Sequence, residues 1–135
     1  MGQRKLVWKM FLKAVGAGIL NLPLAVPLNA AAIAGEADVV DVRVFSEGGG
    51  SYRFDVTLRH GDTGWDHYAD AWEVIAPDGK LLGKRVLFHP HVNEQPFTRT
   101  LGGVPIPADI RKVTLRAHDS VHGTGGKTID VDLPN

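Results

Sequence analysis

Apolar and polar residues alternate without interruption between residues 52 and 59, and this pattern constrains the fold more than any other feature of the chain. The apolar members are Tyr52, Phe54, Val56 and Leu58. Successive side chains of a β-strand point to opposite faces of its sheet, so strict alternation indicates a strand with one buried face. No stretch after residue 34 has the sustained periodicity of an amphipathic helix. The sequence therefore predicts an all-β domain.

Six further segments have the length and apolar content of strands. They are Val39–Phe45, His67–Ile75, Leu81–Phe88, Phe97–Leu101, Val113–Ala117 and Thr128–Leu133. Turn and loop residues separate them, and Ala76-Pro77-Asp78-Gly79 is the strongest turn signal. A Pro/Gly-rich connection is expected over residues 102–110. Seven short strands at this spacing predict a single seven-stranded, immunoglobulin-like β-sandwich.

The first 34 residues have the pattern of a secretory signal peptide. Residues 1–13 contain four basic residues and no acid, residues 14–28 are apolar, and small residues precede Gly35. The apolar segment is short for a membrane span and is interrupted by Pro23 and Pro27. We expect cleavage after Ala34, or a few residues earlier, and a periplasmic or secreted domain over residues 35–135. A retained amphipathic anchor is the alternative.

Charge and composition narrow the class of ligand. All 15 acids follow residue 34, whereas four of the 15 bases precede it, so the mature domain has 11 bases, 15 acids and a formal charge of −4. An acidic domain is a poor partner for nucleic acid, which needs clustered lysine and arginine. The chain has no cysteine, so neither a disulfide nor a lipoprotein anchor is expected. Both methionines fall within the signal peptide, which excludes a thioether copper site.

Six histidines fall at the ends of the expected strands. They are His60, His67, His89, His91, His118 and His122. Because successive strands of such a sandwich run in opposite directions, all six histidines are predicted to lie at the same end of the domain. We call this end the His pole. Four acids belong to it as well: Asp62, Asp66, Glu94 and Asp119.

Neutral imidazole is the commonest metal ligand in proteins, so the His pole predicts a metal site. Our predicted ligands are His60, His67, His118 and His122, with His89 and His91 either completing this set or forming a second, looser site. Strand parity directs His118 outward if its apolar neighbours face the core; His122 would then be the ligand and His118 a supporting group. Without thiolates, the candidate ions are Zn(II), Cu(II), Ni(II) and Fe(II).

Two family resemblances accompany these patterns. The segments 98–107 and 113–119, with Thr100-Leu101-Gly102-Gly103-Val104-Pro105 and Val113-Thr114-Leu115-Arg116-Ala117, resemble the last three strands of a fibronectin type III domain. That resemblance implies a fibronectin type III-like β-sandwich, although Arg111 stands where this family usually has the tyrosine of its tyrosine corner.

The second resemblance concerns the histidine loops. His60-Gly61-Asp62-Thr63 with His67 and Trp72, and the segment from His118 to Gly123, resemble the two ligand segments of desulfoferrodoxin-type superoxide reductases. The resemblance implies a metal at this pole, with His60, His67 and His122 as counterparts of ligands. Histidine replaces the cysteine ligand of that family, and one extra residue separates the two histidines of the second segment.

Three functions remain open at this stage. The first is a periplasmic metal carrier, buffer or accessory protein; the second is a protein-interaction module whose histidines are incidental, because polar residues favour loops. The third is a small metalloprotein similar to superoxide reductase, although a role without catalysis is favoured. The expected partners are a divalent metal ion and, as an open alternative, another periplasmic protein. No nucleic acid is expected, nor any membrane once the signal is cleaved.

Overall fold

The computed structural model describes residues 35–135. The predicted signal peptide, residues 1–34, lies outside the described residues. Within residues 35–135 the regular elements are seven strands without a helix, which confirms the prediction of an all-β chain. A search of the same residues for a helix able to span a membrane finds none.

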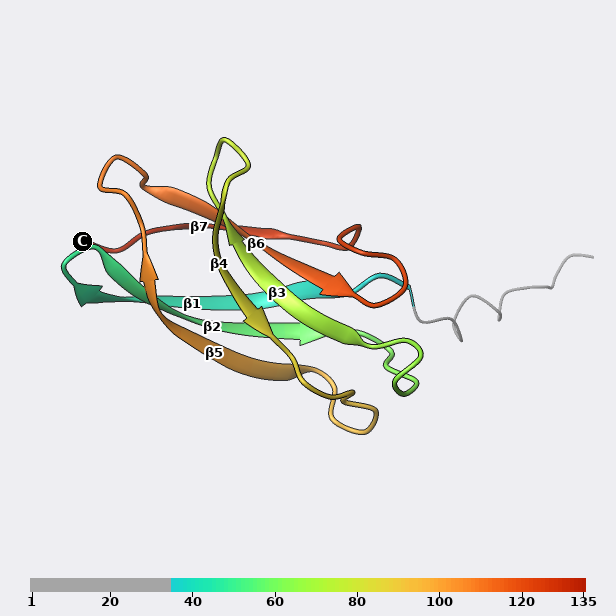
Figure 1. Ribbon diagram of the computed structural model, residues 1–135. Coiled ribbons are helices and arrows are strands. Elements are labelled where there is room, and N and C mark those ends of the chain that lie inside the picture. Colours follow the sequence, from blue (N-terminus) through green and yellow to red (C-terminus); the bar gives the residue numbers. More distant parts are fainter. Residues whose placement is uncertain (1–34) are drawn as a thin grey trace, which may run out of the picture. The chain divides into compact units, whose positions relative to one another are not determined.

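The seven strands form two antiparallel sheets (Figure 1). Their bounds are β1 Asp38–Gly48, β2 Ser51–Arg59, β3 Ala69–Ile75, β4 Leu81–Val86, β5 Phe97–Pro105, β6 Lys112–Asp119 and β7 Ile129–Asp132. One sheet has three strands in the order β1-β2-β5, and the other has four in the order β4-β3-β6-β7. Every pairing within the sheets is antiparallel.

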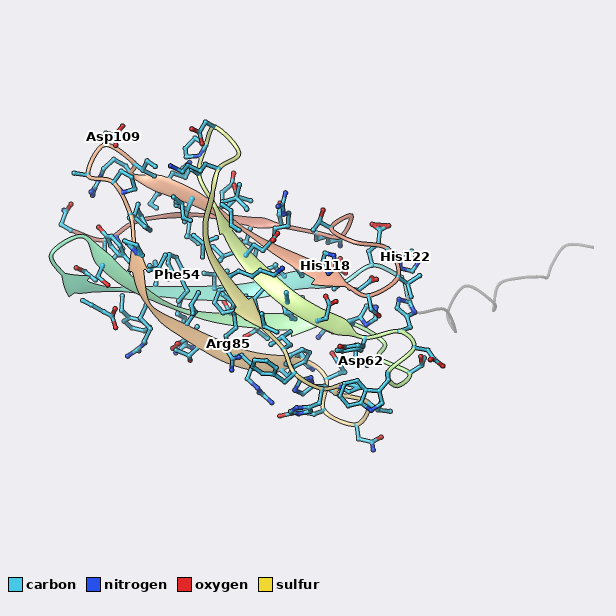
Figure 2. The ribbon with its side chains drawn as sticks, in the orientation of Figure 1. Phe54, Asp62, Arg85, Asp109, His118 and His122 are labelled. Atoms are coloured by element: carbon cyan, nitrogen blue, oxygen red, sulfur yellow. The ribbon has the colours of Figure 1, made fainter. Side chains whose placement is uncertain are left out.

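The hydrophobic core takes residues from both sheets. Phe54, Val56 and Leu58 of β2 are fully buried, as the alternation predicts, and Phe54 lies between the sheets in Figure 2. Trp72 of β3 and Leu115 of β6 are also fully buried and belong to the same cluster. The two sheets therefore share one core, and each strand is held by the face that carries its apolar residues.

Three strands extend further than the sequence pattern indicated, and the first of them, β1, continues from Phe45 to Gly48. β5 continues through the glycines at 102 and 103 to Pro105, because its backbone pairs with β2 where side chains give no strand signal. β6 continues two residues beyond Ala117, so His118 and Asp119 belong to the strand. The alternation of inward and outward side chains therefore continues past Ala117, and the side chain of Asp119 faces inward. The predicted strand ended at Ala117 and gave Asp119 no direction.

One end of the domain collects the segments that bear histidine. The pairs Leu58↔Phe97, Ala69↔Asp119 and Ala71↔Val86 place the end of β2 beside the start of β5, and the start of β3 beside the ends of β6 and β4. These strand ends lie at the right of Figure 1. Connections that leave one sheet here face connections that leave the other, so residues distant in sequence can meet.

Candidate metal centre

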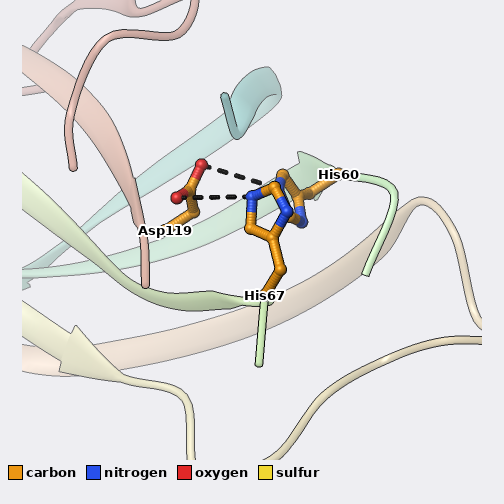
Figure 3. A group of neighbouring side chains, drawn as sticks. All are labelled: His60, His67 and Asp119. Carbon is orange, nitrogen blue, oxygen red and sulfur yellow. Dashed lines mark hydrogen bonds and ion pairs between the residues drawn. The ribbon is translucent and has the colours of Figure 1, made fainter. Parts of the chain in front are cut away.

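Two histidines and one aspartate meet where β2 and β6 end (Figure 3). The Nε2 atoms of His60 and His67 are 3.2 Å apart. Asp119 Oδ2 lies 3.5 Å from His60 Nε2, and Asp119 Oδ1 lies 3.6 Å from His67 Nε2. These three residues could hold one ion between them.

The separations match those of ligands around a small metal ion. With metal–ligand bonds of about 2.0–2.1 Å, two ligand atoms at tetrahedral positions are separated by about 3.3–3.4 Å. The nearest contacts among His60, His67 and Asp119 run from 3.2 to 3.6 Å, with Oδ2 of Asp119 facing His60 and Oδ1 facing His67. One ligand atom from each of the three residues lies within 4.8 Å of the other two, so a rotation of the carboxylate would direct one oxygen to a shared ion.

His60 follows directly after β2 and continues its inward alternation, so its ring is buried. Its backbone N–H donates to the side-chain oxygen of Gln95 at 3.0 Å. Its Nδ1 atom is 2.5 Å from Asp62 Oδ1. Asp62 also accepts the backbone N–H groups of Ala69 at 3.0 Å and His91 at 2.7 Å, so it acts as an acceptor throughout.

This arrangement fixes which nitrogen of His60 can bind a metal. Because the carboxylate of Asp62 accepts, Nδ1 carries a proton, and Nε2 is the ring atom that faces His67 and Asp119; in the neutral ring Nε2 offers its lone pair to this space. A carboxylate behind a histidine ligand orients the ring and raises its basicity in many metal sites. Lone pairs that converge on one point repel each other unless a proton or a cation lies between them.

His67 reaches the site from the loop between β2 and β3. Thr63 and His67 pair across a tight turn, in which Thr63 N–H donates to His67 O at 3.0 Å and His67 N–H donates to Gly64 O at 3.2 Å. Gly64 has a φ of 141°, a conformation that other residues rarely adopt. The ring of His67 meets that of His60 edge to face, with centroids 4.7 Å apart. The turn thus presents a half-buried imidazole to the buried one.

Asp119 is fully buried at the last position of β6. Its Oδ1 atom accepts the backbone N–H groups of Val121 at 2.8 Å and His122 at 2.5 Å, and its Oδ2 atom is 3.2 Å from His122 Nδ1. Burial by itself raises the pKa of this carboxyl, but these hydrogen bonds and the nearby His60 ring outweigh it and hold the pKa below its usual value. Asp119 is therefore an anion at neutral pH and available to a cation.

The other predicted ligands lie in three different places. His122 is exposed beside the site, with its ring centroid 4.9 Å from that of His67. His118 points to the outer face of its sheet, where Nδ1 pairs with the carboxylate of Asp70. His89 and His91 form a pair of their own, with tilted rings whose centroids are 4.6 Å apart. The chain thus brings together His60 and His67, with His122 adjoining them.

An arginine occupies the position that a metal would take at His91. Nη2 of Arg99 donates to His91 Nε2 at 2.9 Å, and the ring stacks on Phe97 with centroids 3.9 Å apart. Burial, followed by the positive charge of Arg99, lowers the pKa of His91. A neutral ring that accepts from a guanidinium has no free Nε2 lone pair for an ion, which argues against a second site here.

The lowered pKa of His91 predicts a pH-dependent cost to folding. Since His91 binds a proton more readily in the unfolded chain, wild-type stability should fall as pH drops below the ordinary value of 6.5. Glu94, Asp62 and His89 also face the ring, and the two carboxylates oppose the shift. In urea unfolding of the metal-free domain, the free energy of unfolding should fall less between pH 7.5 and 5.5 for His91→Gln than for wild type. Exposed His89→Gln is the control, and equal slopes for all three proteins would contradict the prediction.

Sequence reasoning did not assign the two carboxylates their roles. The sequence places Asp62 and Asp119 at the His pole, but it does not identify Asp62 as the partner of His60 Nδ1 or Asp119 as a candidate ligand. The parity of β6 contained a signal for Asp119, because a buried position two residues beyond Ala117 follows from continued alternation. For Asp62 the signal is weaker and consists only of its spacing of two residues from His60.

Comparisons with known proteins give limited information. No family model matches the chain. A protein of Halomicrobium mukohataei described as "Putative lipoprotein" is 45% identical over 97 residues, which are 72% of this chain and 47% of that protein. The chain thus spans about half the length of this relative. A solved structure of superoxide reductase in the oxidised state is matched with 14% identity and a TM-score of 0.41, over 73% of this chain and 89% of that one. A structural match of this size is too weak to assign fold type or function.

Proposed function

We propose that the domain binds one divalent transition-metal ion through His60, His67 and Asp119, and that it acts outside the cytoplasm as a metal carrier, buffer or accessory protein. The observation that carries this proposal is the convergence of two Nε2 atoms and a buried carboxylate at separations of 3.2 to 3.6 Å. The exposed ring of His122 is the nearest further imidazole, and rotation of this ring would direct a nitrogen to the same ion.

The ligand chemistry favours ions of intermediate softness. Two imidazoles and one carboxylate suit Zn(II), Cu(II), Ni(II) and Fe(II), whereas Ca(II) and Mg(II) prefer sites built from oxygen alone. The negative charge of Asp119 offsets part of the positive charge of the ion in a place from which water is largely excluded. Asp62 supports the site from behind His60.

Two observations support a location outside the cytoplasm. One is the order of charged, apolar and small residues over residues 1–34. The other is the description of the relative as a lipoprotein. We also propose that the domain is a β-sandwich of the immunoglobulin or fibronectin type III kind, a proposal that the strand orders β1-β2-β5 and β4-β3-β6-β7 support.

Metal-dependent stability tests the proposed site. A metal that binds only the folded domain should stabilise it by about 2.7 kcal/mol at a free concentration one hundred times the Kd. Thermal unfolding should therefore shift upward for wild type on addition of Zn(II) or Cu(II) at pH 7.5, relative to a chelator. The shift should be lost in His67→Ala and in His60→Ala/His67→Ala, and reduced at pH 5.5, where free imidazoles are protonated.

The matched control is His89→Ala, which removes an exposed histidine from the same end of the domain. Its metal-induced shift should equal that of wild type. If none of Zn(II), Cu(II), Ni(II) and Fe(II) stabilises wild type, or if the double variant gains as much as wild type, the domain is not a metal-binding protein of this kind. The histidines would then be incidental to a module with another role.

A further inference from the structure

The backbone of the chain enters the candidate site at Gly35. The carbonyl oxygen of Gly35 lies 3.0 Å from His60 Nε2, the nitrogen that faces His67 and Asp119. In the neutral ring, whose proton is on Nδ1, both atoms of this contact offer lone pairs. A proton on Nε2, or a metal ion held between the two atoms, would make the contact favourable.

The position of Gly35 follows from how the next residues are held. Ala37 is 1% exposed, Val39 N–H donates to Lys127 O at 2.9 Å, and Lys127 N–H donates to Asp38 Oδ1 at 2.8 Å. At Gly126 an added Cβ would overlap the carbonyl of Ala37, so the loop can approach this segment only because glycine stands there. The segment before β1 is therefore fixed in place, and it delivers Gly35 to the metal ligands.

We infer that cleavage after Ala34 creates a metal ligand, namely the free α-amino group of Gly35 acting with its own carbonyl oxygen. The inference rests on the proposed metal site. Cleavage hydrolyses the Ala34–Gly35 peptide bond: the C–N bond breaks, the OH of water goes to the carbonyl carbon of Ala34, and its H goes to the nitrogen of Gly35. An amide nitrogen, whose lone pair is delocalised into the carbonyl, is thereby replaced by an amine that can donate its lone pair.

The geometry of glycine suits such a chelate. When ψ is close to 180°, the nitrogen and carbonyl oxygen of one residue lie about 2.7 Å apart, a distance that one metal ion can bridge. This is the ordinary extended conformation of the backbone, so the chelate needs no strained geometry at residue 35. The carbonyl oxygen already lies beside His60, so binding an ion there would bring the α-amino group within reach of the same ion. His60, His67, Asp119 and the amino terminus would then surround the metal.

The inference gives the site a dependence on export. In the uncleaved chain the nitrogen of Gly35 is an amide and contributes no ligand, so the precursor binds the metal more weakly. Removal of residues 1–34 completes the ligand set. The protein would therefore acquire its full affinity only after it has crossed the membrane, where it would not compete with metalloproteins of the cytoplasm.

The first experiment determines where the exported protein begins. The full chain is expressed with export, and the mass and amino-terminal sequence of the exported product are measured. The inference requires Gly35 as the first residue, with an unblocked amine. A product that begins at any other residue overturns it and leaves the histidine and aspartate ligands of the proposed function unaffected.

The second experiment compares amino termini on residues 35–135, which contain both sheets and the whole described core. Cu(II) and Zn(II) affinities are measured by competition with a chelator for the free Gly35 amine, the Nα-acetylated form and a form that begins at Ala34. We expect the free amine to bind at least about tenfold more tightly than the other two, because a tethered ligand acts at high effective concentration. Its Cu(II) absorption should lie at shorter wavelength, as expected for one more nitrogen ligand.

Two controls separate the possible explanations. His89→Ala removes an exposed histidine that is outside the proposed ligand set, so with a free Gly35 amine it should bind like the free Gly35 form. In the His60→Ala/His67→Ala background the free amine should confer no advantage. Equal affinities for all three amino termini, or an advantage that persists in that background, overturn the inference while metal binding stands. Failure of every form to bind either ion overturns the proposed function and the inference together.

Discussion

Replacing Asp62 with alanine is expected to destabilise the metal-free domain by about 3–5 kcal/mol, because two buried backbone N–H groups lose their acceptor. Asp62 is 6% exposed and accepts from Ala69 N–H at 3.0 Å and His91 N–H at 2.7 Å, while also holding His60 Nδ1. A loss of this size is a large fraction of the stability of a small domain. Urea unfolding of the wild type and the variant in the presence of a chelator measures the difference.

Asp62→Asn separates the structural role from the effect on the metal. With the amide oxygen in place of Oδ1, His60 Nδ1 and Ala69 N–H keep their acceptor, and only His91 N–H faces the NH2 group. A neutral amide is a weaker acceptor than a carboxylate, so it orients the His60 ring less firmly and raises the basicity of Nε2 less. Zn(II) affinity should then fall about 10- to 100-fold, as for other groups that orient a histidine ligand.

The control is a second aspartate that pairs with a histidine. Asp70 contacts His118 Nδ1 on the partly exposed outer face, so Asp70→Asn should leave Zn(II) affinity unchanged and cost less than about 1 kcal/mol. Equal losses of affinity for Asp62→Asn and Asp70→Asn would show that a change of net charge is responsible. In that case Asp62 does not act through His60.

The alternation of apolar residues was sufficient to predict an all-β domain and the end of it where His60, His67 and Asp119 meet. The inward residues of β2 are all buried, and the same parity continues to His60, which is buried as well. Antiparallel pairing then brings β2, β3 and β6 to a common end, where Ala69 pairs with Asp119. The alternation of apolar residues and the direction of successive strands depend on residues close together in the sequence, so both can be predicted from it.

The identity of the ligands depended on where β6 ends. A strand that ended at Ala117 would leave His118 and Asp119 free to turn in either direction, and a pattern of five residues does not reveal two more. The backbone pairing of Asp119 with Ala69 extends the strand, sends His118 out to Asp70 and buries Asp119. Such pairing is made between main chains. Continued alternation gives Asp119 an inward position, but the polar side chains at 118 and 119 do not extend the apolar pattern that predicted the strand.

The histidine pair at residues 89 and 91 shows a second limit of the sequence. Its His-x-His spacing suits a metal, but a residue distant in sequence contacts one of the two rings. Arg99 on β5 places Nη2 2.9 Å from His91 Nε2, and Phe97 stacks on the ring. Contacts between a loop and a neighbouring strand depend on packing across the sheet edge, so the spacing of two histidines alone does not distinguish a ligand from the partner of an arginine.

Asp119→Asn is expected to lower Zn(II) affinity by at least about 100-fold, more than the loss of a group that merely orients a ligand. Oδ1 of the amide can still accept from Val121 and His122 N–H, so the connection after β6 keeps its hydrogen bonds. What the variant loses is the anionic oxygen that would contact the ion. Asp119→Ala would lose both the hydrogen bonds after β6 and the anionic oxygen, and should destabilise the metal-free domain by about 2–4 kcal/mol.

The pH dependence of the metal-free domain supplies an independent measurement. The folded pKa of Asp119 lies below its ordinary value of 3.8, so the carboxylate stabilises the fold above that pH, and this contribution is lost as pH falls through the folded pKa. Asp119→Asn should therefore be less sensitive to acid between pH 5 and 2, as a rough range for this transition. Asp66→Asn, an exposed acid at the same end, is the matched control for both measurements. If Asp119→Asn binds Zn(II) like wild type, or if Asp66→Asn loses as much affinity, the buried carboxylate is not a ligand, and the ion would have to be held by imidazoles alone.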